Sequence, residues 1–299
     1  MKITGLHFLL TYQCTFECDH CFAWGSPWQS GVMTLDDIRL FLGQAQDLGT
    51  VRWIYFEGGE PFLYYATLVR GVNIAAEMGF QVGLVSNAYW ASSLEDALEF
   101  LKPFKGLVQD LSVSSDLFHY NEKLSQQCQN ASTAAEQLRI PLGVISVAQP
   151  QDASPSACGQ LPAGESSVMY RGRAIEKLAQ YAEWQPWETF DACPHEDLGE
   201  PGRVHLDPLG NIHICQGISL GNLHQTTLAE ICASYDPQAH PICGPLLNGG
   251  PAELVRRYDL PHLERYADAC HLCYSTRLGL RDTFPQVLSP DQMYGVLEK

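Results

Sequence analysis

The chain has 299 residues, enough for one large α/β domain or for a domain with an extension. Its formal net charge of −16 argues against nucleic-acid substrates and anionic membrane surfaces, because both require a basic footprint. No apolar run approaches a membrane span, and the start lacks the features of a signal peptide. The eleven cysteines are clustered, which suits metal binding better than a disulfide framework, so we expect a cytoplasmic protein in a reducing compartment.

Short apolar runs alternate with helical patterns over roughly the first half of the chain, which is typical of a parallel α/β fold. The predicted strands are Ile3–Leu10, Val51–Phe56, Gln81–Val85, Leu107–Val113 and Leu142–Val147. The predicted helices begin at Thr34, Leu63, Ser92 and Asn121 and end near Leu48, Met78, Phe104 and Leu138. A short strand from Val168 and a helix to Tyr181 complete the pattern. The sequence therefore predicts an incomplete, TIM-like (β/α)6 barrel.

Three cysteines follow the first predicted strand. Cys14, Cys18 and Cys21 have the spacing C-x3-C-x2-C, and thiolates so close in one loop can ligate a single [4Fe–4S] cluster. Such a cluster has four irons, so one iron stays open, as the spare position on a catalytic zinc does. The alternatives are three buried thiols or a zinc knuckle, with His20 as an awkwardly placed fourth ligand.

Small and polar residues follow the next three predicted strands. Two glycines allow close approach of a ligand to the backbone, and the carboxylate after them can accept hydrogen bonds from an ammonium group. Ligands in barrel-like folds collect at the carboxyl ends of the strands, so we expect these residues to share one site. Alone, each motif is also an ordinary turn. The residues concerned are Gly58, Gly59, Glu60, Asn87, Ser114 and Asp116.

A second group of cysteines lies beyond residue 190, where the α/β alternation ends. Cys193, Cys215, Cys270 and Cys273 provide four thiolates, enough to saturate a second [4Fe–4S] cluster or a structural zinc. Residues 204–214 alternate about a Gly-Asn turn and are predicted to form a β-hairpin.

The other four cysteines have no assigned ligand role. Cys128 and Cys232 are predicted to pack in the core, where a free cysteine behaves as a small hydrophobe. Cys243 is predicted in a turn, from which it could replace a ligand or donate a hydrogen atom. The sequence assigns no role to Cys158 and no oligomeric state.

The C-x3-C-x2-C loop followed by Gly-Gly-Glu-Pro resembles the radical S-adenosylmethionine (SAM) superfamily. The resemblance implies that Cys14, Cys18 and Cys21 hold a catalytic cluster whose open iron chelates SAM. It also implies that Gly58-Gly59-Glu60 holds the SAM amino group, while Asn87, Ser114 and Asp116 complete the cofactor site. In that family the reduced cluster splits SAM, and the resulting 5′-deoxyadenosyl radical abstracts hydrogen from the substrate.

The C-terminal cysteines resemble the auxiliary-cluster extension called SPASM, and in particular its shortened form, twitch, as in the 2-deoxy-scyllo-inosamine dehydrogenases. This likeness implies a barrel over residues 1–184, a twitch domain over 185–284 and a tail over 285–299. Arg171 and Arg173, which recur in relatives at the domain junction, could meet the cluster's charge or a carboxylate, or only form surface salt bridges.

An auxiliary cluster that accepts an electron favours net oxidation, such as the dehydrogenation of a small molecule. The alternatives are a maturase that crosslinks or epimerises a ribosomally made peptide, and a non-catalytic iron–sulfur or zinc scaffold. The expected partners are a small-molecule or peptide substrate and an external electron donor such as flavodoxin or ferredoxin, with neither nucleic acid nor membrane.

Overall fold

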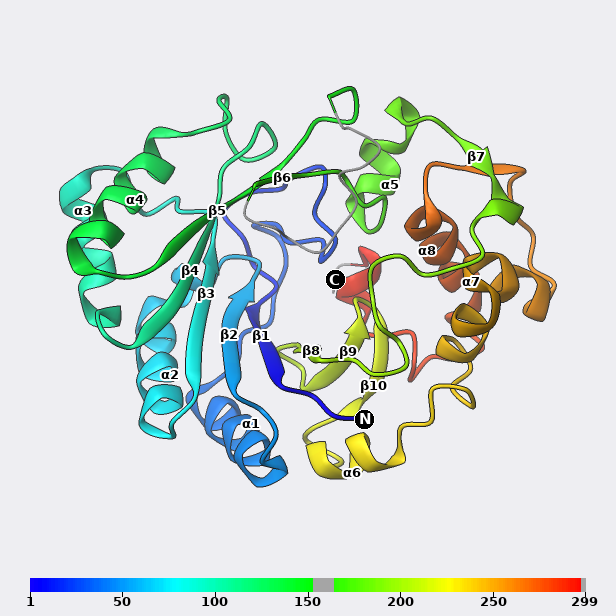
Figure 1. The fold of residues 1–299 in the computed structure, drawn as a ribbon, viewed down its shortest axis with the longest axis horizontal. Helices are drawn as coiled ribbons and strands as arrows, with labels where there is room; N and C mark the ends of the chain where they lie inside the picture. Colours follow the sequence, from blue (N-terminus) through cyan, green and yellow to red (C-terminus); the bar gives the residue numbers. More distant parts are fainter. Residues whose placement is uncertain (153–163, 297–299) are drawn as a thin grey trace.

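The computed structural model describes residues 1–152 and 164–296, so Cys158 lies outside the described residues. Its main element is a nine-stranded sheet with the strand order β10-β9-β8-β1-β2-β3-β4-β5-β6 (Figure 1). The strands are β1 (Gly5–Thr11), β2 (Trp53–Gly58), β3 (Gln81–Ser86), β4 (Val108–Ser114), β5 (Leu142–Val147), β6 (Gly164–Ser166), β8 (Arg203–Leu206), β9 (Asn211–Cys215) and β10 (Ile218–Asn222). Strands β7 (Gln185–Pro186) and β11 (Arg265–Tyr266) form a separate small sheet.

The helices fall into two groups along the chain. Those that follow strands of the barrel are α1 (Leu35–Leu48), α2 (Tyr65–Glu77), α3 (Leu94–Leu101), α4 (Gln126–Leu138) and α5 (Arg173–Lys177). Those of the C-terminal part are α6 (Leu228–Ser234), α7 (Cys243–Tyr258) and α8 (Ala269–Leu280). Helices α1 to α4 lie along one side of the sheet, whereas α7 and α8 lie beyond β8 to β10 (Figure 1). Among the described helices, none is long and apolar enough to cross a membrane.

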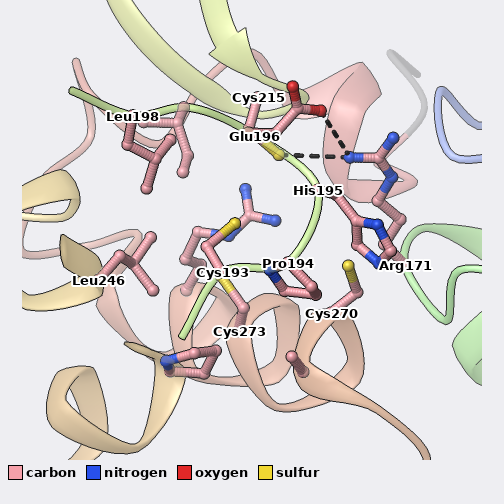
Figure 2. A pocket seen from close by; sticks show the side chains of 14 residues that line it. Arg171, Cys193, Pro194, His195, Glu196, Leu198, Cys215, Leu246, Cys270 and Cys273 are labelled. Carbon is pink, nitrogen blue, oxygen red and sulfur yellow. Dashed lines mark hydrogen bonds and ion pairs between the residues drawn. The ribbon is translucent and has the colours of Figure 1, made fainter. Parts of the chain in front are cut away.

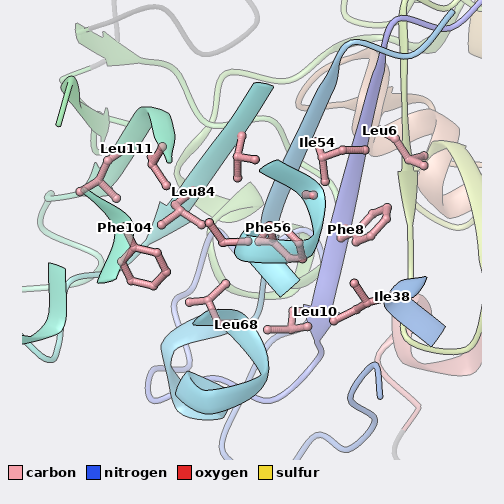
Figure 3. Packing of buried hydrophobic residues seen from close by; sticks show 14 of the residues in the cluster. Leu6, Phe8, Leu10, Ile38, Ile54, Phe56, Leu68, Leu84, Phe104 and Leu111 are labelled. Atoms are coloured by element: carbon pink, nitrogen blue, oxygen red, sulfur yellow. The ribbon is translucent and has the colours of Figure 1, made fainter. Parts of the chain in front are cut away.

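Strands β1 to β6 are parallel, and each pairs with the next along the chain. Alternate residues of β1, including Leu6, Phe8 and Leu10, are fully buried against α1 and α2 (Figure 3). Burial of one face of each strand under helices is what a parallel sheet requires. The predicted α/β fold with a parallel sheet is confirmed.

The predicted sixth strand is misplaced. Strand β6 spans Gly164–Ser166, and the chain from Val168 to Arg171 is not a strand. The backbone N–H of Tyr170 donates to the Asp268 carboxylate at 3.0 Å, so it is unavailable for a sheet ladder. Helix α4 also begins later than predicted, because the Ser125 hydroxyl caps it by accepting from the N–H of Cys128.

The predicted hairpin forms and also extends the barrel sheet. β8 and β9 are antiparallel around a turn that the buried Asp207 stabilises by accepting from the N–H groups of Leu209 and Asn211, both at 2.9 Å. β8 in turn pairs with β1 in parallel, from Gly5 opposite Arg203. A second hydrophobic core joins β1 to the C-terminal helices. The two parts of the chain therefore share one sheet and one core, and the domain boundaries at 184 and 284 stay a prediction.

Candidate active site

The loop that carries Cys14, Cys18 and Cys21 is fastened to the end of β2. The N–H of Gly59 donates to Thr11 O at 2.7 Å, and the N–H of Glu60 donates to Gln13 O at 2.8 Å. A Cβ atom on Gly59 would lie only 2.1 Å from Gln13 O, so no larger residue fits there. The close approach of the two backbones explains the glycine and holds the start of the loop against the sheet.

Two sulfur atoms of this loop accept hydrogen bonds from N–H groups, and burial disfavours ionisation of the Cys14 and Cys18 thiols in the absence of a cation. The Cys14 Sγ accepts from Phe16 N at 3.4 Å and Asn87 Nδ2 at 3.5 Å, and the Cys21 Sγ accepts from Gly25 N at 3.2 Å. Burial, aided by the charge on Glu60, raises the pKa of Cys14 to about 12. Burial and the neighbouring thiolates also raise the pKa of Cys18. A cationic iron–sulfur core would offset both costs, and N–H···S bonds suit its thiolates, so the donor set fits a [4Fe–4S] cluster.

A cavity of about 580 Å³ opens beside this loop. This volume falls within the range of small-molecule sites, about 300–1,000 Å³. Its wall includes all three loop cysteines and four of the six residues predicted to bind SAM. These four are Gly58, Gly59, Asn87 and Ser114.

Glu60 lies behind the cavity wall. Its carboxylate is fully buried, and its oxygens accept from Phe62 N at 3.0 Å, Ser86 Oγ at 2.9 Å and Asn87 N at 2.7 Å. Burial raises the pKa of Glu60 to about 7, despite these three donors. The contacts seen in the structure tie the end of β2 to the end of β3, and the role of Glu60 toward the SAM amino group stays a prediction.

Asp116 is buried in a similar way. Its oxygens accept from Phe118 N at 2.9 Å, from Val147 N at 3.1 Å and from the N–H of His119, whose Nδ1 lies 2.8 Å away. Burial alone would raise the pKa of Asp116, but His119, His20 and the Phe118 N–H together outweigh it and the pKa is lowered. The residue stabilises the turn after β4, so its predicted contact with SAM also stays a prediction.

The four C-terminal cysteines line one small cavity (Figure 2). Cys215 ends β9, and Cys270 and Cys273 lie in the first turns of α8, which Asp268 caps by accepting from His271 N at 2.7 Å. Cys193 comes from the irregular segment before β8. Burial raises the pKa of Cys193, Cys270 and Cys273, the last to about 11. Four converging thiols are a ligand set for an iron–sulfur cluster or for zinc, and both metals remain open.

Comparisons with known proteins show a similarity in the region of the first site. Residues 8–140 match the model of the Radical SAM superfamily. This part of the chain is similar to that superfamily. The matched region contains the cysteine loop, the Gly-Gly-Glu-Pro segment, most of β1 and all of β2 to β4.

Two curated relatives and one solved structure are similar to the chain. An S-adenosylmethionine-dependent nucleotide dehydratase of Fibrobacter sp. (strain UWH6) is 24% identical over 158 residues, which are 50% of this chain and 45% of the relative. The peptide biosynthesis protein YydG of Bacillus subtilis (strain 168) is 32% identical over 111 residues, 37% of this chain and 35% of the relative. The chain thus spans less than half the length of either relative. The crystal structure of BtrN in complex with AdoMet and 2-DOIA has a TM-score of 0.51 at 15% identity, over 77% of this chain and 82% of BtrN, and shows the same fold.

Two buried arginines lie beside the four C-terminal thiols. Arg171 Nη1 donates to Cys215 Sγ at 3.4 Å and lies 3.5 Å from the Glu196 carboxylate. Arg277 donates to Gln216 O at 2.7 Å and lines the same cavity. The residues are 6% and 1% exposed, so both charges can act on a buried four-thiolate site, although Glu196 offsets part of the charge of Arg171.

Arg173 faces the radical SAM loop instead. Its guanidinium donates to Cys18 O at 2.8 Å and to Gly25 O at 2.9 Å, and the residue is 3% exposed. Gly172, with φ +60°, lies so close to the loop that a Cβ would be 2.7 Å from Cys21 O. The Arg-Gly-Arg segment therefore connects the two cysteine sites, and the surface salt-bridge alternative is wrong.

The remaining described cysteines are buried. Cys128 and Cys232 belong to the main hydrophobic core, as predicted. Cys243 is the first residue of α7 rather than part of a turn, because His240 Nδ1 accepts from its N–H at 3.0 Å and the chain continues into the helix. Burial raises its pKa to about 12. Its role as a ligand or hydrogen donor stays a prediction.

Sequence reasoning missed the polar residues that line the inner wall of the cavity. His7, Tyr55, Glu57 and His205 lie on β1, β2 and β8 and all face the cavity or its rim. The alternation of residues along β1 could have indicated one of them. Leu6 and Phe8 are buried on one face of the strand, so His7, which lies between them, points to the opposite face.

Proposed function

We propose that this chain cleaves SAM reductively and abstracts a hydrogen atom from a small organic substrate, in a net oxidation. A [4Fe–4S] cluster with one open iron, when bound, supplies the electron that splits SAM and releases the 5′-deoxyadenosyl radical that takes the hydrogen. The observation that carries the proposal is the cavity wall, where Cys14, Cys18 and Cys21 lie beside Gly58 and Gly59.

The chain's own residues divide the work of the first site. The three thiols would hold the cluster, and Asn87 and Ser114 would contact SAM from the strand ends. Glu60 and Asp116 keep these strand ends in place from behind the wall, through hydrogen bonds to the backbone. Arg173 stabilises the conformation of the loop by donating hydrogen bonds to two of its carbonyl oxygens.

We assign Cys193, Cys215, Cys270 and Cys273 to a second, auxiliary [4Fe–4S] cluster. Four thiolates would saturate it and leave no iron for substrate, which favours electron transfer over substrate binding. After loss of the hydrogen atom the substrate radical must give up one electron and a proton, and this site lies across the Arg171–Arg173 segment from the first. Zinc is the alternative, and it would make the site structural.

The volume of the cavity supports a small substrate. A space of about 580 Å³ among the strands suits a small molecule, and we place dehydrogenation of such a molecule first. Modification of a peptide is the second candidate, favoured by the similarity to YydG, which is described as a peptide biosynthesis protein. Either reaction would take its first electron from an external donor such as flavodoxin or ferredoxin.

The test is anaerobic incubation of the reconstituted protein with SAM and dithionite. Release of 5′-deoxyadenosine is expected in the wild-type protein and should be abolished when Cys14, Cys18 and Cys21 are all replaced by alanine. Intact SAM in a wild-type sample with full iron loading would contradict the proposal and favour a non-catalytic scaffold.

A further inference from the structure

A histidine–glutamate–histidine group lies in the cavity on three adjacent strands of the sheet. His7 is on β1, Glu57 is on β2, and His205 is on β8, which pairs with the other side of β1. His7 Nδ1 lies 3.3 Å from Glu57 Oε2, and His205 Nε2 lies 3.2 Å from Glu57 Oε1. One ligand atom from each of the three residues can be chosen so that all three lie within 4.8 Å of one another.

The contacts within this group do not have hydrogen-bond geometry. His7 Nδ1 and Glu57 Oε1 are buried, and neither has a hydrogen-bond partner among the described residues. Buried polar atoms are normally hydrogen-bonded, so two buried atoms that have only ion-pair contacts within this group leave lone pairs for a ligand. Adjacent ligand atoms around a first-row cation, at about 2.1 Å from it, are about 3 Å apart, which matches the separations seen here.

We propose that His7, Glu57 and His205 bind one divalent first-row cation, such as Mn²⁺ or Fe²⁺. Two imidazoles and one carboxylate on one side of a cation, with open positions on the other, are a recurring ligand set for these metals. The three residues line the cavity of about 580 Å³, so the open positions face the space that also borders the cysteine loop. The substrate class that would complete the coordination is an oxygen donor, such as a hydroxyl, carbonyl or carboxylate compound.

Neighbouring side chains support the orientation of this group. The ring of Tyr55 stacks on His7 at a centroid distance of 4.5 Å, and its hydroxyl donates to Asp110 at 2.9 Å. This stacking restricts the plane of the His7 imidazole. The nearby cation Arg203 is paired with Glu196 at 3.8 Å, which reduces its repulsion of a bound metal.

Titration with Mn²⁺ tests the proposal without any knowledge of the substrate. The holoprotein is kept with its iron–sulfur clusters oxidised, and loss of the free Mn²⁺ signal is followed by electron paramagnetic resonance. One bound Mn²⁺ per chain is expected. Glu57→Gln and His205→Gln should each weaken binding at least about tenfold, because loss of even an outer partner of a metal ligand has effects of that size.

Glu95→Gln is the matched control. It makes the same chemical change as Glu57→Gln at an exposed residue of α3, outside the cavity wall, and should bind Mn²⁺ within about twofold of the wild type, well short of the tenfold loss expected for the ligands. Equal cluster absorption of all variants shows that they are folded. Absence of Mn²⁺ binding, or equal binding by Glu57→Gln, would overturn the proposal. Because Mn²⁺ binding does not need SAM cleavage, this result is independent of the proposed reaction.

Discussion

Replacement of Arg173 by alanine should destroy the first site and spare the second. The side chain is buried and donates two hydrogen bonds, to Cys18 O at 2.8 Å and to Gly25 O at 2.9 Å. A hydrogen bond from a charged donor contributes about 1.5–3 kcal/mol, so the loop loses about 3–6 kcal/mol of local stabilisation. A loss of this size is enough to open the part of the loop around Cys18 locally, because the backbone bonds to Thr11 and Gln13 hold only the start of the loop.

The assay is iron content after anaerobic reconstitution, combined with 5′-deoxyadenosine release. Arg173→Ala should lose about four irons, the content of one cluster, and nearly all SAM cleavage. The matched control is Arg171→Ala, two residues away, which removes a contact with Cys215 instead and should retain SAM cleavage. Full iron content and normal SAM cleavage in Arg173→Ala would refute the assignment of this arginine to the cysteine loop.

Three further predictions concern single residues of the same site. Cys18→Ala should abolish SAM cleavage and lower the iron content while the second cluster's absorption remains; unchanged iron would remove the loop from the mechanism. Gly59→Ala should fail to load the first cluster, since its Cβ would lie 2.1 Å from Gln13 O, and iron analysis checks this. Because burial raises the pKa of Glu60 to about 7, the fold is favoured with this group protonated, and that contribution is lost as the pH rises from about 4.5 to 7. The wild type and Glu60→Gln should therefore differ in the urea midpoint of unfolding by an amount that changes across this pH range. A difference that does not vary with pH would contradict the raised pKa of Glu60.

Local sequence patterns predicted the parts of the structure that depend on local physics. The apolar run Gln81–Val85 became β3 almost without change, because its strand character follows from its own residues. The hairpin around Gly210 also formed, since a turn sequence largely determines its own geometry. The two cysteine groups were found because ligand spacing is visible along the chain.

Long-range pairing was not predictable in the same way. No local signal places Arg203 opposite Gly5, so the junction of β8 with β1 was missed. Likewise, the partners of Glu60 come from the end of β3, and only the folded sheet brings them together. The strand predicted from Val168 does not form. The carboxylate of Asp268, far along the chain, accepts a hydrogen bond from the backbone N–H of Tyr170, which a strand would need for its ladder.

The most direct test of the open cluster site is the electron paramagnetic resonance spectrum of the dithionite-reduced protein, recorded with and without SAM. If Cys14, Cys18 and Cys21 hold a cluster with one open iron and the four C-terminal cysteines hold a saturated one, two signals are predicted. SAM should shift only the signal that disappears in the triple alanine variant of the loop. A spectrum that SAM leaves unchanged, or a shift that persists in that variant, would contradict the account.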